Sequence, residues 1–231
     1  MIENPKISVI MSVYNSDSFV GSSIQSILDQ TFDDFEFLIY NDGSTDKTLE
    51  LIKSFRDIDK RISVISSRRN IGLTKSLNKL VQLSKGDILA RQDADDISFP
   101  DRFKIQHDKL ARNNLDAVYS RAVRGNSKSK IPGISYYLPK KIVIKYKNPY
   151  IHGTLLIRKK VLEKVGRYDE KFYYSQDYKL AYDLQKQKYK IGNISRPLYK
   201  LNTSNNISTL YSEKQKYYAD CVKRQIEPVS N

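Results

Sequence analysis

The sequence is poor in the residues that form covalent cross-links and soft-metal sites. Cys221 is the only cysteine among 231 residues, and the chain has two histidines and no tryptophan. A single cysteine excludes a disulfide within one chain, and it excludes a zinc site built from several cysteines. This cysteine usage is typical of a reducing compartment, so we expect a cytoplasmic location.

Long apolar segments and glycine-rich phosphate loops are missing as well. No run approaches the roughly 18 apolar residues that span a bilayer. Residues 1–6 lack the apolar core of a secretory signal. The chain contains neither G-x-G-x-x-G nor G-x-x-x-x-G-K-[ST]. Their absence disfavours a dinucleotide site and a P-loop.

Acidic residues are in the minority. The chain has 40 Lys and Arg against 26 Asp and Glu, a formal net charge of +14. A basic surface suits nucleic acid, anionic lipid or phosphorylated substrates. A lysine surface that is merely solvated remains the alternative, so the charge does not by itself select a partner.

Apolar strand-like runs alternate with segments of helical periodicity over the first half of the chain. Strands are predicted at residues 7–13, 35–40, 62–65 and 87–91, each followed by a predicted helix. This alternation predicts an α/β fold with a mostly parallel, Rossmann-like sheet and helices on both faces.

The regularity weakens in the second half. We predict further strands near residues 117–121, 155–158 and 191–201, and a loop over 125–133. Helices are predicted over residues 138–146, 160–165, 178–188 and 212–225.

Polar turns follow three of the early strands. They contain Tyr14-Asn15, Asn41-Asp42 and the acidic residues 93–96. In parallel sheets, ligands bind beyond the carboxyl ends of the strands. The three turns therefore predict a nucleotide-and-metal site at this edge of the sheet.

The third turn holds three carboxylates within four positions, Asp93, Asp95 and Asp96. Carboxylates this close repel one another, and a hard divalent cation such as Mg²⁺ or Mn²⁺ offsets that cost. The alternative is a solvated acidic loop that caps the next helix. In either case we predict Ser98 as the N-cap of that helix, three residues before Asp101.

Four segments together resemble the inverting glycosyltransferases of family 2, which have the GT-A fold. They are residues 8–15 (SVIMSVYN), 41–46 (NDGSTD), 91–96 (RQDADD), and 166–169 (GRYD) followed by 176–180 (QDYKL). The resemblance runs over residues 7–208. It implies one compact domain, with an α/β half that binds the nucleotide sugar (residues 1–121) and a half with the acceptor site and catalytic base (122–208). A basic tail helix follows (209–231).

The resemblance also implies roles for single residues. The nucleotide would be bound by Val13, Asn15, Asp42, Asn70 and Asp93. Asp42 would form a hydrogen bond to the nucleobase. Asp95, with Asp93, would hold Mn²⁺ or Mg²⁺. Asp177 would be the general base that deprotonates the acceptor hydroxyl.

The sequence departs from the family pattern in places. In the family, the catalytic base is usually preceded by an acidic residue, whereas here Gln176 precedes Asp177. The late strand has no histidine to bind metal, which leaves Lys200 as the residue assigned to the phosphate. His152 is assigned to the acceptor side. The Q-x-x-R-W motif of processive synthases is absent, which favours transfer of a single sugar.

The expected function is transfer of a sugar from a nucleotide diphosphate donor, most often UDP-linked in this family, to a glycan or lipid-linked acceptor. Surface polysaccharide synthesis is the expected setting. The basic surface would attach the protein peripherally to the inner face of the membrane. A basic nucleic-acid-binding protein and a metal-dependent nucleotidyltransferase are the alternatives. The first does not explain the acidic turn, which repels phosphates unless it holds a metal, and the second usually has a glycine-rich loop after the first strand.

Overall fold

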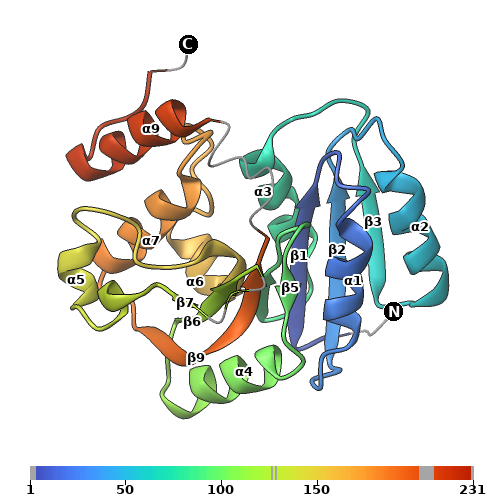
Figure 1. Cartoon of the computed structure of the whole chain (residues 1–231), viewed down its shortest axis with the longest axis horizontal. Coiled ribbons are helices and arrows are strands. Elements are labelled where there is room, and N and C mark those ends of the chain that lie inside the picture. Colours follow the sequence, from blue (N-terminus) through green and yellow to red (C-terminus); the bar gives the residue numbers. More distant parts are fainter. Residues whose placement is uncertain (1–3, 126, 128, 203–210, 230–231) are drawn as a thin grey trace.

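The computed structural model describes residues 4–125, 127, 129–202 and 211–229. Its centre is a nine-stranded sheet (Figure 1). One half consists of parallel strands in the order β3-β2-β1-β4. These strands are β1 (Ile7–Val13), β2 (Phe35–Asn41), β3 (Ile62–Ser66) and β4 (Ile88–Arg91).

The sheet continues from β4 through the second half of the chain in the order β8-β6-β9-β5. Strand β8 (Leu156–Arg158) runs antiparallel to both β4 and β6 (Ala117–Arg124), whereas β9 (Ile191–Leu201) is parallel to β6. The short strands β5 (Ile97–Ser98) and β7 (Lys130–Ile131) pair with β9 and β6. Strands of the two halves thus form one curled, mostly parallel sheet, as predicted.

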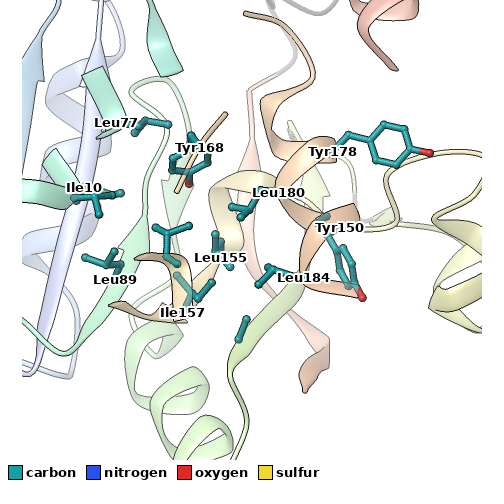
Figure 2. Close-up of a cluster of buried hydrophobic side chains, with 14 of the residues drawn as sticks. Ile10, Leu77, Leu89, Tyr150, Leu155, Ile157, Tyr168, Tyr178, Leu180 and Leu184 are labelled. Carbon is teal, nitrogen blue, oxygen red and sulfur yellow. The ribbon is translucent and has the colours of Figure 1, made fainter. Parts of the chain in front are cut away.

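Helices cover both faces of the sheet, and each face has its own buried apolar cluster. One face carries α1 (Val20–Leu28), α2 (Thr48–Ile58) and α4 (Arg102–Arg112). The other carries α3 (Leu73–Leu83), α6 (Lys159–Lys164), α7 (Gln176–Lys186) and α9 (Ser212–Arg224). Figure 2 shows part of this second cluster, in which Tyr168 lies near Leu77 and Leu180.

The alternation of side chains along the first strand explains why it needs helices on both sides. Val9, Met11 and Val13 belong to one apolar cluster and Ile10 to the other, and all four are buried. Successive side chains of a strand point to opposite faces. Burying an aliphatic side chain of this size contributes about 1.5–3 kcal/mol, so covering only one face would forfeit much of that stabilisation.

The prediction that Ser98 caps a helix is wrong. Ser98 lies in β5, where its hydroxyl donates to Gln92 Oε1 (2.7 Å) and its backbone N–H donates to Ser26 Oγ (3.1 Å). The next helix begins at Arg102, after Asp101. The acidic turn therefore connects β4 to a short strand, because β9 offers β5 a pairing edge that local sequence does not reveal.

The second half differs from prediction mainly at element boundaries. The loop predicted over residues 125–133 includes β7, and the helix predicted over 138–146 is reduced to α5 (Lys140–Val143). Short 3₁₀ turns occur at Ile134–Tyr136 and His152–Thr154. The predicted boundary between the donor half and the acceptor half, after residue 121, lies inside β6. The two halves therefore share one strand, and the boundary can separate only their proposed functions. In the described residues, every helix is too short or too polar to cross a membrane.

Candidate functional site

The turns after β1 and β2 are bound to each other. Asn15 Oδ1 accepts a hydrogen bond from the backbone N–H of Thr45 (2.9 Å), and the Asn15 N–H donates to Ser44 Oγ (3.0 Å). Asn15 has a φ of 47°, a left-handed conformation that asparagine tolerates better than most residues. The first two predicted nucleotide-binding segments thus form one surface, with Val13 buried beneath it.

Asp42 fixes the turn that follows β3. Its buried carboxylate accepts hydrogen bonds from the backbone N–H groups of Ile71 (2.8 Å) and Gly72 (2.9 Å). Asn70 Oδ1 also accepts from the Gly72 N–H, at 3.0 Å. Each carboxylate oxygen has a second lone pair, so these two bonds leave Asp42 further capacity to accept hydrogen bonds. The structure therefore gives Asp42 a supporting role that the motif alone did not indicate.

The glycine after Asp42 is required by a close approach of two turns. Gly43 has a φ of +75°, and a Cβ atom there would lie 2.6 Å from the backbone carbonyl carbon of Arg69. Only glycine fits such a contact in this conformation. The turns after β2 and β3 therefore lie against each other, a contact that the three predicted turns did not include.

In the acidic turn, two of the three carboxylates are already bound by the protein. Asp93 pairs with the buried guanidinium of Arg91 (2.5 Å), and Asp96 accepts the backbone N–H of Asn202 (2.7 Å). The hydroxyl of the buried Tyr199 accepts the Asp93 N–H (3.0 Å), which ties the turn to β9. Asp95 differs, because in the described part of the chain its side chain forms no ion pair and accepts a hydrogen bond only from its own backbone, while Arg91 acts on it as a nearby charge.

Two carboxylates of the acidic turn have raised pKa values. Burial and the charge of Asp93 raise the pKa of Asp95 to about 6. Burial, together with Asp93 and Asp95, raises the pKa of Asp96 well above its ordinary value. In both cases burial is the largest cause and the neighbouring carboxylates add to it, so the folded state disfavours the ionised forms of Asp95 and Asp96. A bound cation would favour them.

The donor set fits a cation shared with a substrate. Within the described residues, no group of three or more His, Cys, Asp or Glu side chains comes together in a metal-binding arrangement. Mg²⁺ in proteins usually takes only one or two carboxylates and completes its shell with water and substrate phosphates. Asp95 and Asp93 meet that requirement for Mg²⁺ or Mn²⁺.

A buried polar network supports the acidic turn from below. Gln92 Nε2 donates to the backbone carbonyls of Asp93 (3.1 Å) and Asp96 (2.9 Å). The buried Arg102 donates to the Arg91 carbonyl (2.6 Å) and to Gln92 Oε1 (3.0 Å). Burial lowers the pKa of Arg102 to about 10, which leaves it charged at neutral pH. Sequence reasoning missed this network, although an arginine in the first turn of a helix, where the dipole disfavours it, was a signal.

Asp177 lies in the first turn of α7 and is held by a residue that sequence reasoning did not single out. Asn148 Nδ2 donates to Asp177 Oδ2 (2.8 Å), while Asn148 Oδ1 accepts the backbone N–H of Tyr150 (3.1 Å). The second bond fixes the orientation of the amide, so its NH₂ group faces the carboxylate. The residue before the helix, Ser175, is left-handed (φ 55°) and donates to the Gln215 carbonyl of α9 (3.1 Å).

A buried histidine–tyrosine pair lies near both the acidic turn and Asp177. His152 Nε2 is 2.9 Å from the hydroxyl of Tyr168. Burial and then the charge of Arg91 lower the pKa of His152 to about 4, against the opposing charges of Asp93 and Asp177. His152 is therefore neutral at pH 7, and both carboxylates lie close enough to act on it.

Gly153, the residue after His152, lies very close to the acidic turn. A Cβ atom at Gly153 would lie 2.4 Å from the Tyr199 hydroxyl oxygen and 2.7 Å from Asp93 Oδ2. The structure thus brings together Asp93, His152 and Asp177, which are 84 residues apart at the extremes. The other two predicted residues are less central, since Gln176 is buried at the start of α7 and Lys200 lies on β9 opposite Ile97 in β5.

The structure thus joins the turns after β1, β2 and β3, and it places Asp93 of the acidic turn and Asp177 near His152. Comparison with known proteins identifies the family to which this arrangement belongs. Residues 8–166 match the family model of glycosyl transferase family 2. The chain belongs to this family and is a glycosyltransferase.

Several curated relatives agree. An uncharacterized glycosyltransferase of Methanocaldococcus jannaschii is 32% identical over 231 residues, covering 94% of this chain and 78% of that protein. The O-antigen biosynthesis glycosyltransferase WbnJ of Escherichia coli is 36% identical over 180 residues, covering 75% of this chain and 69% of WbnJ. The putative glycosyltransferase EpsE of Bacillus subtilis is 34% identical over 161 residues, and the match covers 68% of this chain and 58% of EpsE.

Solved structures show the same fold. TarS 1-349 of S. aureus in complex with UDP-GlcNAc superposes with a TM-score of 0.79 at 18% identity, covering 97% of this chain and 68% of that one. The mannosyltransferase PcManGT of Pyrobaculum calidifontis in complex with GDP-Man and Mn²⁺ gives 0.72 at 17% identity, covering 97% and 66%. The chain therefore has the GT-A fold, as the sequence resemblance implied.

Proposed function

We propose that this glycosyltransferase moves one sugar, with inversion, from a UDP-linked donor to a hydroxyl of a glycan or lipid-linked acceptor. The observation that carries the proposal is the presence of two kinds of carboxylate near the His152–Tyr168 pair. Asp95, beside Asp93, is buried and has a raised pKa, whereas Asp177 is held by a hydrogen-bond donor and a helix N-terminus. The first arrangement suits a metal–diphosphate complex and the second suits a base.

On the donor side, the joined turns of β1, β2 and β3 would bind the nucleoside. Asp42 is assigned to the base, with Val13, Asn15 and Asn70 around it and Asp93 near the ribose. When bound, Mn²⁺ or Mg²⁺ on Asp95 would neutralise the charge that develops on the leaving diphosphate. The nucleotide sugars in the TarS and PcManGT structures, and the Mn²⁺ in the latter, support this assignment.

On the acceptor side, Asp177 would take the proton of the attacking hydroxyl. The acceptor oxygen then forms a bond to the anomeric carbon while the bond from that carbon to the diphosphate oxygen breaks, which inverts the configuration. The helix N-terminus stabilises a carboxylate at this position. Gln176 and His152 would line the acceptor side, and Lys200 would assist the phosphate.

A tyrosine-lined groove adjoins this region and suits a saccharide. It has a volume of about 810 Å³ and lies between the start of α3, the segment before α7, and α9. Its rings form a nearly continuous band made of Tyr173, Tyr174, Tyr211, Tyr217 and Tyr218. Tyrosine offers an apolar ring face for sugar C–H groups and a hydroxyl for sugar oxygens. Tyr173 also packs on Gly72, which links the groove to the donor turn.

Polysaccharide biosynthesis is the setting that we assign, because WbnJ is named for O-antigen biosynthesis. We place the reaction in the cytoplasm or on the inner face of the membrane, and we expect no nucleic-acid partner.

Incubating the protein with a panel of UDP- and GDP-sugars and Mn²⁺ tests the reaction class. We expect release of nucleoside diphosphate from one of them, and no release from any would contradict the proposal.

Asp42→Ala is expected to weaken UDP binding about tenfold or more, whether or not Mn²⁺ is present. The substitution removes the proposed contact to the base, and it also frees the turn that Asp42 holds through Ile71 and Gly72. Calorimetric titration with UDP measures the effect, with Asp57→Ala on the exposed side of α2 as the control. A loss seen only in the presence of Mn²⁺ would argue against a contact to the base.

Asn148→Ala is expected to lower kcat about tenfold and to leave the affinity for UDP unchanged. The alanine removes the donor that holds Asp177 Oδ2, and hydrogen bonds to charged groups contribute about 1.5–3 kcal/mol. Asn113→Ala at the exposed end of α4 is the matched control. Equal rates for the two variants would show that Asn148 does not position Asp177.

A further inference from the structure

Large apolar side chains gather on one exposed segment next to the acceptor side. Ile134, Tyr137, Leu138, Ile142 and Tyr146 are 87, 75, 51, 56 and 71% exposed. Single exposed apolar residues are ordinary, but several close together mark an interaction surface. These five residues, with the exposed Lys141, Lys145 and Lys147, are called the outer patch below.

The outer patch belongs to a stretch of chain without acidic residues. Between Asp116 and Glu163 the sequence contains no Asp or Glu, whereas it contains eleven Lys and Arg residues. In the described part of the chain, no ion pair involves Lys141, Lys145 or Lys147. The positive charge of the patch is therefore not neutralised within the molecule.

The segment that carries the outer patch is attached to the rest of the protein by hydrogen bonds, so its apolar residues are exposed in an ordered segment. Arg121 donates to the carbonyls of Lys130 (3.3 Å) and Pro132 (2.8 Å), and its guanidinium lies 4.9 Å from the centre of the Tyr136 ring. Lys140 donates to the carbonyls of Ser135 (3.2 Å) and Leu138 (3.3 Å).

Helix α5 has one side bound to the protein and one side exposed. Val143, the last residue of α5, and Ile144, which follows it, are buried, and the Ile144 carbonyl accepts a hydrogen bond from the hydroxyl of Tyr178 on α7 (2.6 Å). Ile142 in the helix and Tyr146 in the turn that follows it are both exposed. Figure 1 shows α5 at the edge of the molecule, beside α7.

We propose that the outer patch docks this protein on an anionic membrane surface. Aliphatic side chains enter the boundary between headgroups and acyl chains, tyrosines favour that interface, and lysines bind anionic headgroups. Nucleic acid fits less well, because Ile134, Leu138 and Ile142 offer nothing to phosphates. A second copy of the chain fits less well too, because two such patches would bring like charges together.

The outer patch is next in sequence to a residue of the proposed acceptor side. Asn148, which binds Asp177, follows the last lysine of the patch directly. Docking would bring the acceptor side close to the membrane, where a lipid-linked acceptor is found. This consequence rests on the proposed function, whereas the docking itself does not.

Co-sedimentation with vesicles tests the proposal. The wild-type protein is expected to bind vesicles containing phosphatidylglycerol, to bind them less at high salt, and to bind phosphatidylcholine vesicles weakly. Ile134→Ser with Ile142→Ser is expected to lower binding at least tenfold, and so is Lys141→Gln with Lys145→Gln and Lys147→Gln. The matched controls are Ile58→Ser, which is 84% exposed on α2, and Lys53→Gln with Lys60→Gln. They are expected to bind as the wild type does.

Three results would overturn the proposal: no binding by the wild type, equal binding by patch and control variants, or binding that ignores lipid charge and salt. A single-stranded oligonucleotide is titrated in parallel. If the patch variants lose oligonucleotide binding and keep vesicle binding, the patch is a nucleic-acid surface instead. Thermal unfolding of each variant confirms that it folds.

The same variants separate this inference from the proposed function. Sugar transfer to a water-soluble acceptor should be unchanged in the patch variants. If transfer occurs without vesicle binding, the docking surface is wrong and the enzyme assignment stands. If vesicles bind through the patch and no donor is used, the docking surface stands and the enzyme assignment is wrong.

Discussion

Asp177→Asn is expected to bind UDP and Mn²⁺ as the wild type does and to transfer sugar at least about a hundredfold more slowly. A hydroxyl is a poor nucleophile, and a positioned general base contributes roughly 10²–10⁴-fold to the rate. Asparagine keeps the size of the side chain and most of its interaction with the helix start, but it does not accept a proton. The expected loss is therefore confined to the chemical step.

The measurement is a transfer assay combined with calorimetric titration of UDP on the same preparation. Asp183→Asn, on the same helix, is the control, because Asp183 pairs with Lys179 (2.5 Å) and has no assigned role. A near wild-type rate for Asp177→Asn would show that the base lies elsewhere, and Asp169 or Glu170 would be examined next. Loss of UDP binding would instead show that Asp177 supports the donor site.

Asp95→Ala is expected to abolish the part of UDP binding that depends on Mn²⁺. Its affinity in the presence of Mn²⁺ should fall to that of the wild type after chelation. Asp95 is the member of the acidic turn whose side chain is not already held by Arg91, as Asp93 is, or by β9, as Asp96 is. Asp87→Ala, just before β4 and exposed, is the control. Wild-type affinity in Asp95→Ala would remove the metal assignment.

The same residue should reveal a cost in stability. The folded state raises the pKa of Asp95 from 3.8 to about 6, because burial and Asp93 disfavour the ionised form. A carboxylate with a raised pKa in the folded state destabilises the protein as the pH rises through this range. Without metal at neutral pH, Asp95→Asn should therefore unfold at the same temperature as the wild type or higher. A clear decrease would mean that Asp95 has a structural partner.

Much of the fold follows from patterns that are local in sequence. The first four strands are continuous apolar runs, because strands covered by helices on both faces are buried on both sides. The polar turns after these strands were predictable too, because a change from apolar to polar residues marks the end of a buried strand. The acidic turn was predicted because three carboxylates lie within four positions at the end of a strand, although a solvated capping loop was the alternative.

The parts that could not be predicted depend on contacts between distant residues. Ser98 looks like a helix cap, but its partners are Ser26 and Gln92, and its strand exists only because β9 lies beside it. Asn148 has no motif, and its role appears only when the fold brings it to Asp177, 29 residues later. Asp42 was assigned to the nucleotide alone, while its bonds to the turn after β3 span about 30 residues. Sequence spacing carries no information about such pairs.

The central claim is that the acidic turn and the joined turns of β1 to β3 bind a nucleoside diphosphate together with a divalent metal. The most direct test is a calorimetric titration of the wild-type protein with UDP and, separately, GDP, in Mn²⁺ and in EDTA. We predict that one of these nucleotides, UDP in our assignment, binds in Mn²⁺ and binds at least tenfold more weakly in EDTA. Binding of neither nucleotide, or equal affinity with metal and with chelator, would contradict the claim.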